Sequence, residues 1–405
     1  MLQAQNIIYK INLYLLPLAL FFILISPALT NIFIVLSVLS SLILIIKNKD
    51  TKKIFEEKVF IICFSIFILL LLSYMYTISE FEQYYEIIKK YIKFLYIPLF
   101  VYFIRIQNNS ALTIKYFIYG CTLILFLSYC KYFEIINFSN FYNFLQSMNI
   151  SQTKIKIFEN NTAVFQNYII QGIVFSFFSF LCLYLFIKKS NFIYLILSLL
   201  SFFNVLFMND SRTAYILILI LFGLCLFSII TNIRIKLSVI VFFSALLFTQ
   251  VSENLEFRIK TLTSDLAHMQ SNNYNSSLGL RYIWAKVGLD NLKNKPVLGF
   301  GAGSYKNTCE IYFTRNDYSQ YDLYVTNNPH NEFVSLSTQL GCIGLSLFIA
   351  FLYFLFRDSG REVLYLGITL TVFISSIFNS AFYDNMLGLF LVIIISILYQ
   401  RDLKF

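Results

Sequence analysis

Arg212, Arg281 and His330 are among the residues in the second half of the chain whose side chains are suited to group transfer at a charged centre. The imidazole of His330 can take a proton from a hydroxyl at neutral pH, because its ordinary pKa is about 6.5. A planar guanidinium can hold phosphate oxygens through two parallel N–H bonds, a geometry that lysine cannot match. Simpler interpretations also exist, since His330 could cap the helix that follows it, and either arginine could extend from an interface towards water.

The composition places these residues in a membrane protein. Hydrophobic residues make up 58% of the chain and charged residues 13%, and the mean hydropathy is +0.71. Apolar stretches long enough to cross a hydrocarbon core of about 30 Å recur along the chain. The net charge of +10 comes from basic residues scattered through short loops, which is typical of membrane topology and argues against nucleic-acid binding.

The hydropathy pattern predicts an all-α polytopic integral membrane protein with about twelve transmembrane helices. The first apolar segment could be a cleavable signal, but a second begins almost at once at Ile32, which favours an uncleaved first span. The predicted spans are residues 11–29, 32–46, 59–78, 91–104, 116–133, 164–187, 191–208, 213–231, 237–251, 333–356, 362–378 and 386–399.

These spans divide the chain into three parts: spans 1–9 in residues 1–251, a long loop in residues 252–332, and spans 10–12 in residues 333–405. With both termini in the cytoplasm, 16 of the 31 Lys and Arg residues lie in cytoplasmic segments and 7 in short external ones. The other 8 lie in the long loop, which the positive-inside rule exempts. The long loop, and the three residues introduced above, are therefore predicted to lie on the external face.

Two elements are predicted within the long loop. The segment "LRYIWAKVGLDNLKNKP" has apolar residues near helical spacing, which predicts an amphipathic helix on or near the membrane surface that ends before Pro296. In "VLGFGAGSY", the glycines lack the register of a nucleotide-binding loop, and we expect a tight glycine turn. Tyr305 and Trp284 could stack on sugars or act as interfacial anchors.

The spacing around His330 resembles the signature of the bacterial O-antigen ligases. The sequence has His330 and Asn331, then nine residues, then Gly341, two residues and Gly344. "NDSRTAY" and "GLRYIW" place an arginine in a short external turn and in the long loop, as that family does. O-antigen polymerases and protein O-oligosaccharyltransferases of the same superfamily carry similar histidine segments.

The resemblance implies a membrane glycosyltransferase C-like fold in the bacterial inner membrane, with a periplasmic active site. It implies metal-independent, inverting transfer of a glycan from undecaprenyl pyrophosphate to a sugar hydroxyl of lipid A–core, without a cofactor. His330, Arg212 and Arg281 are then the expected catalytic residues, and the arginines would also bind substrate together with Asn331, Tyr305 and Trp284. Gly341 and Gly344 would let a neighbouring helix pack closely.

Several acidic residues are expected to have structural roles. Glu80 and Glu82 are interpreted as the solvated face of a short interfacial helix rather than as metal ligands. Asp210 could orient Arg212 or, somewhat more favourably, cap the next helix. Glu332 could hold the tautomer of His330, but at this spacing on a helix its side chain would point away.

Other functions remain open at this stage. A polymerase would use another lipid-linked glycan as acceptor, and a protein glycosyltransferase would use a Ser or Thr hydroxyl. A flippase or other transporter of lipid-linked glycans belongs to a different class. Its substrate path normally carries charged groups at mid-membrane, and the predicted spans contain very few.

Overall fold

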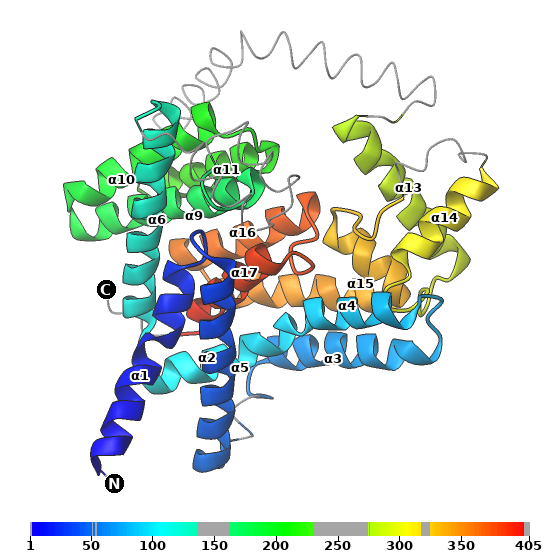
Figure 1. The fold of residues 1–405 in the computed structure, drawn as a ribbon, viewed down its shortest axis with the longest axis horizontal. Coiled ribbons are helices and arrows are strands. Elements are labelled where there is room, and N and C mark those ends of the chain that lie inside the picture. Colours follow the sequence, from blue (N-terminus) through cyan, green and yellow to red (C-terminus); the bar gives the residue numbers. More distant parts are fainter. Residues whose placement is uncertain are drawn as a thin grey trace, which may run out of the picture.

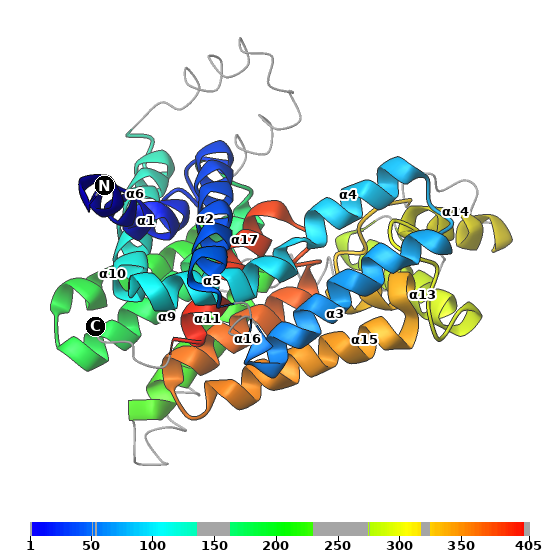
Figure 2. The same ribbon diagram turned by 90° about the horizontal axis from the view of Figure 1, so that it is seen from below.

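The computed structural model describes residues 2–50, 52, 55–135, 163–229, 274, 276–316 and 325–400. Every regular element in this part of the chain is helical (Figures 1 and 2). The elements are α1 (Leu2–Phe21), α2 (Pro27–Asn48), α3 (Lys58–Leu72), η2 (Ser73–Met75), α4 (Phe81–Tyr91), α5 (Lys93–Gln107), α6 (Ser110–Tyr132), α9 (Tyr168–Lys189), α10 (Phe192–Phe203), η3 (Asn204–Met208), α11 (Arg212–Ile229), α13 (Ser277–Asn294), α14 (Tyr305–Arg315), α15 (Glu332–Ser359), α16 (Val363–Phe378) and α17 (Asn385–Leu398).

Five of these helical segments are long and apolar enough to cross a membrane, and five shorter apolar helices accompany them. This agrees with a polytopic membrane protein, while the predicted total of twelve spans stays a prediction, since span 237–251 lies outside the described residues. The predicted first span was too long. The helix α1 ends at Phe21, and α2 begins at Pro27, whose fixed φ suits a first helical position, with Ser26 as its cap.

Two helices that are apolar on every side form the centre of the bundle. Residues 386–398 of α17 are all buried, and so are residues 170–185 of α9, including Phe175, Phe178 and Phe180. A helix that is apolar all round has no face suited to water and therefore belongs inside. By contrast, α2 exposes a row of large apolar side chains, such as Ile43 and Ile46, as a lipid-facing helix would.

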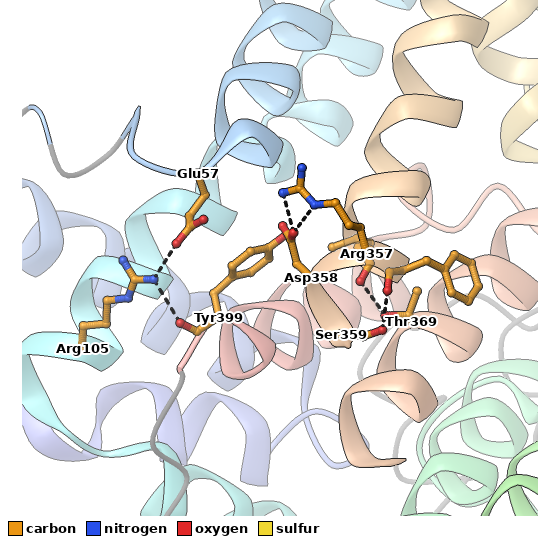
Figure 3. A network of polar contacts seen from close by, with 9 residues as sticks. Glu57, Arg105, Arg357, Asp358, Ser359, Thr369 and Tyr399 are labelled. Carbon is orange, nitrogen blue, oxygen red and sulfur yellow. Dashed lines mark hydrogen bonds and ion pairs between the residues drawn. The ribbon is translucent and has the colours of Figure 1, made fainter. Parts of the chain in front are cut away.

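One end of the bundle carries a network of charged side chains (Figure 3). Arg105 at the end of α5 lies 3.2 Å from a carboxylate oxygen of Glu57 and donates to the carbonyl oxygen of Tyr399 at 3.1 Å. The Tyr399 hydroxyl donates to Asp358 at 3.0 Å, and Arg357 contacts the same carboxylate. These residues stand at the end of α15 opposite to His330, so the predicted cytoplasmic charges and the predicted external site lie at opposite ends of one helix.

The described part of the long loop, mainly residues 276–316, forms a small helical layer with a core of its own. The predicted amphipathic helix is present as α13, which buries Ile283, Trp284 and Val287 against Tyr305 and Phe313 of α14. Sequence periodicity did not reveal α14. Figures 1 and 2 both place α13 and α14 beside the beginning of α15, far from α1 and α2.

This layer is attached to the bundle at a break in α15. Gly341 has φ 62° and ψ −152°, which interrupts the helix and leaves backbone groups without helical partners. The glycine-rich segment supplies them: Phe300 N–H donates to Thr338 O, Gly301 N–H donates to Gln339 O, and Cys342 N–H donates to Pro296 O. The predicted tight glycine turn is thus confirmed, since Gly299, Gly301 and Gly303 all have positive φ.

The role predicted for Gly341 and Gly344 was wrong. A Cβ atom on Gly341 would lie 2.4 Å from the carbonyl oxygen of Val297, which belongs to the loop, and one on Gly344 would contact Leu340 of its own helix. Gly341 therefore allows the helix to break and the loop to approach it closely. The segment that packs here is the loop and not a neighbouring helix.

Replacing Gly341 by alanine should destabilise the protein more than replacing Gly360. Both glycines have a positive φ with strongly negative ψ, so either alanine strains the backbone by about 1–3 kcal/mol. Only Gly341→Ala adds a clash, worth roughly 1–3 kcal/mol more, because no atom lies within 4 Å of a Cβ on Gly360. Thermal unfolding in detergent measures the difference, and equal midpoints would show that the loop does not dock on the break.

Candidate active site

A cavity of about 660 Å³ lies where the loop layer meets the bundle. Its walls come from the beginnings of α9, α11 and α15, from α13, and from the end of α16. The lining residues are Tyr168, Ile169, Asp210, Ser211, Arg212, Thr213, Ile216, Leu278, Arg281, Tyr282, Ala285, Pro329, His330, Asn331, Val334, Ile377 and Phe378. The fold thus brings together Arg212, Arg281 and His330 from three separate segments of the sequence.

A polar turn presents Arg212 to the cavity. The side chain of Asn209 accepts from Ser211 N–H at 2.8 Å and donates to the carbonyl oxygen of Tyr168 at 2.9 Å, which ties the turn to α9. The Ser211 hydroxyl accepts from Ala214 N–H at 3.3 Å. Ser211 therefore caps α11, and the expectation that Asp210 would do so was wrong. Asp210 is exposed and lines the cavity, and the structure records no ion pair between it and Arg212.

Arg281 projects from α13 into the same cavity and is half-buried. Its pKa is lowered first by burial and then by the positive charge of Arg212, while Tyr168 acts in the opposite direction. The two guanidinium groups are thus close enough to repel each other. Within the described part of the chain neither forms an ion pair with a carboxylate, so the lining holds two basic side chains and one acidic one, Asp210.

The backbone at His330 holds the imidazole at the rim of this positive region. His330 has φ 51°, an uncommon left-handed conformation, and its N–H donates to the side-chain oxygen of Asn328 at 2.9 Å. Its ring lies 5.3 Å from the Trp284 ring, centroid to centroid. The pKa of His330 is lowered by burial and by the positive charge of Arg281, while the negative charge of Asp384 acts in the opposite direction. The neutral imidazole, which is the form able to accept a proton, is therefore favoured.

Asn331 lines the cavity and forms hydrogen bonds within the protein. Its side-chain oxygen accepts from Val334 N–H at 3.0 Å and so caps α15, and its amide donates to Ile377 O at 2.8 Å. Its backbone N–H donates to the Ser380 hydroxyl at 3.1 Å. Asn331 lines the cavity, but these bonds use it to fix the backbone beside His330 to the end of α16.

Glu332 anchors the same backbone from below. Its carboxylate is fully buried, accepts from the Tyr91 hydroxyl at 2.5 Å and accepts from Phe382 N–H at 2.8 Å. As expected from its spacing, Glu332 thus points away from His330. The nearby Lys93 ammonium donates to the carbonyl oxygen of Asp384. Sequence reasoning missed Tyr91 and Lys93 as neighbours of the site, because they lie about 240 residues away along the chain.

Trp284 and Tyr305 do not line the cavity. Tyr305 is buried in the core of the loop layer, and its hydroxyl donates to the carbonyl oxygen of Trp284 at 2.9 Å. The indole ring of Trp284 lies against His330 and is 9% exposed. In this arrangement neither ring has a free face for a sugar, and Trp284 instead supports the imidazole.

The remaining polar residues near the site form no cluster of metal ligands. No group of three His, Cys, Asp or Glu side chains gathers within the residues that the structure describes. Glu80, directly before α4, and Glu82, in its first turn, are both exposed, and α4 buries Tyr84, Ile87 and Tyr91 on its other face. The expected short helix with solvated acidic residues is therefore present, and its place at a membrane interface stays a prediction. His268, the other histidine of the chain, lies outside the described residues.

Comparison with known proteins finds a family match over the segment that supplies most of the residues lining the cavity. Residues 195–349 match the family model described as O-antigen ligase, and no curated protein matches the chain. The matched range contains Arg212, Arg281 and His330, together with the break at Gly341. The match confirms, over residues 195–349, the resemblance to the O-antigen ligase family that was seen in the sequence.

Proposed function

We propose that this protein is an O-antigen ligase that transfers a glycan from undecaprenyl pyrophosphate to a sugar hydroxyl of lipid A–core. The family match supports a glycosyltransferase of the ligase or polymerase type. The observation that carries the finer proposal is the cavity that Arg212 and Arg281, which form no ion pair among the described residues, share with His330, whose pKa is lowered. The proposed site lies at the periplasmic face of the inner membrane, with both termini in the cytoplasm.

The charge of the cavity matches the donor. A lipid-linked pyrophosphate carries at least two negative charges, and its approach would relieve the repulsion between Arg212 and Arg281. Half-burial of Arg281 strengthens such contacts, because the site is less well screened than open water. Ile169, Ile216 and Phe378 give the cavity an apolar side on which the lipid end of the donor could rest.

In the proposed reaction, the acceptor oxygen attacks the anomeric carbon of the donor sugar. The bond between that carbon and the pyrophosphate oxygen breaks, and the leaving pyrophosphate takes the electron pair. The proton of the acceptor hydroxyl passes to His330. Arg212 and Arg281 stabilise the charge that develops on the leaving group, and attack from the opposite face inverts the anomeric configuration. This route needs neither a metal ion nor a cofactor.

The identity of the acceptor distinguishes a ligase from a polymerase and from a protein glycosyltransferase. In a deletion strain, loss of the whole lipopolysaccharide ladder with accumulation of lipid-linked O-antigen is expected for a ligase, and a gel of lipopolysaccharide reads this out. One repeat retained on the core would instead indicate a polymerase. Loss of protein glycosylation would indicate a protein O-oligosaccharyltransferase, and retention of lipid-linked glycan on the cytoplasmic side would indicate a flippase.

Replacing either cavity arginine by lysine should abolish most activity, although the charge is kept. Loss of a bidentate contact to phosphate costs about 1.5–3 kcal/mol, so transfer should slow roughly tenfold to more than a hundredfold in Arg212→Lys and in Arg281→Lys. Arg315→Lys is the matched control, because Arg315 is exposed, lies outside the cavity and faces Asp290 at 3.5 Å. Near-normal transfer by both cavity variants at equal expression would reduce the arginines to interfacial anchors.

Removal of the imidazole should stop transfer without preventing donor binding. His330→Ala and His330→Asn should each transfer glycan at least roughly a hundredfold more slowly than the wild type. The asparagine variant tolerates the left-handed backbone at this position and so controls for misfolding. If the asparagine variant folds and transfers glycan at the normal rate, His330 is a structural residue.

The pH dependence of wild-type transfer offers an independent check on the same residue. Because burial and Arg281 lower the pKa of His330, the base stays neutral below its ordinary value of 6.5. Activity should therefore hold as the pH falls to about 6.5 and decline only at lower pH, with no such decline in the residual activity of His330→Asn.

A further inference from the structure

A second cavity of about 630 Å³ lies far from the proposed active site, between α6 and the junction of α9 with α10. Its lining residues are Ala111, Leu112, Ile114, Lys115, Ile118, Tyr119, Thr122, Leu185, Lys189, Asn191, Ile193, Tyr194 and Leu197. It is formed by the first turns of α6 and the last turn of α9, at the end of the bundle where α5 stops beside Arg105. Nothing in the proposed transfer reaction uses this cavity.

Charge is distributed unevenly in this cavity. Lys115 and Lys189 both line it and both are exposed, and none of the described residues that line it is acidic. The Lys115 ammonium lies 5.7 Å from the centre of the Tyr119 ring, also in the wall. The mouth of the cavity therefore holds two basic side chains and no acidic one, and it stands at the level of the predicted cytoplasmic basic residues.

Apart from the two lysines, the polar side chains in the lining are Tyr119, Thr122, Asn191 and Tyr194. Ile114, Ile118, Leu185 and Leu197 form most of the wall. Thr122 lies seven residues beyond Lys115, about two helical turns deeper along α6. Its hydroxyl oxygen is buried and has no hydrogen-bond partner in the described part of the chain. Burying a hydroxyl without a partner costs free energy, so a ligand that offers an acceptor at this depth would be favoured.

These features fit one kind of molecule. A phospholipid has a negatively charged phosphate at the membrane surface, ester carbonyl groups just below it, and acyl chains deeper still. Basic pockets between transmembrane helices on the cytoplasmic side suit such headgroups. A water-soluble anion would match the lysines but leave the apolar wall and Thr122 without a partner.

We propose that this cavity binds an anionic phospholipid of the cytoplasmic leaflet. Lys115 and Lys189 contact its phosphate, Thr122 donates a hydrogen bond to an ester carbonyl, and the apolar wall holds the upper part of an acyl chain. The site is distinct from the donor cavity, so it stands whether or not the chain is a ligase.

Native mass spectrometry of the full-length protein in detergent tests this proposal. The probes are phosphatidylglycerol and phosphatidylcholine with identical acyl chains. One phosphatidylglycerol should stay bound per chain with an affinity at least roughly tenfold above that of phosphatidylcholine. Lys115→Gln/Lys189→Gln should reduce phosphatidylglycerol binding to the level of phosphatidylcholine. Thr122→Val should weaken both lipids severalfold, because both carry the ester group.

The matched control is Lys47→Gln/Lys188→Gln, which removes two exposed lysines at the same end of the bundle that do not line the cavity. It should bind phosphatidylglycerol like the wild type. Equal affinity of the wild type for the two lipids would overturn the proposal, and this measurement requires no variant to fold. Equal losses in the two double variants would also overturn it, as would displacement of the lipid by millimolar inorganic phosphate.

Discussion

The break in α15 at Gly341 is the constraint on which the arrangement of the site depends. A transmembrane helix satisfies its own backbone groups, and any interruption at membrane depth leaves donors and acceptors that must find partners within the protein. Here the glycine-rich segment provides them, and its glycines permit the approach because side chains would collide with Thr338, Thr77 and Tyr84. The other side of that segment is held by Thr77 and Ser79, whose hydroxyls donate to Ala302 O. The loop is thus fixed between two parts of the bundle, and α13 is fixed with it.

The attachment of the loop layer to the bundle brings Arg281 close to Arg212 and His330. Arg281 belongs to the loop layer, whereas Arg212 and His330 belong to the bundle, so their proximity exists only while the loop is docked. Bringing two guanidinium groups together is unfavourable without an anion. The pKa of Arg281 is lowered first by burial and then by the charge of Arg212. A ligand of opposite charge would offset both effects, which agrees with the leaving group of the proposed reaction.

Part of this site could be predicted from the sequence. The order and spacing of Arg212, Arg281 and His330 indicated the family, and helical periodicity located α13. The direction of a side chain was harder to predict, since Tyr305 and Trp284 have the same types as sugar-stacking residues but are used in a core formed with α14. Asn331 likewise has polar groups suited to a ligand, yet its side-chain oxygen caps α15, and its side-chain amide and backbone N–H donate to residues 46 and 49 positions away. Partners at such distances follow from the fold and leave no local pattern.

The buried charges near the site also bear on the choice between an enzyme and a transporter. A path for a charged substrate would require polar groups along the membrane, each able to exchange its partner. Glu332 and Lys93 are instead held by fixed local bonds, to Tyr91 and Phe382 N–H in one case and to Asp384 O in the other. These bonds join α4, α5, α15 and the connection between α16 and α17 directly beneath His330. Because removing one partner of such a network leaves a buried charge exposed to apolar surroundings, the network resists movement. A network that resists movement beneath His330 agrees with its proposed role as a general base, and it is poorly suited to passing a substrate through the bundle.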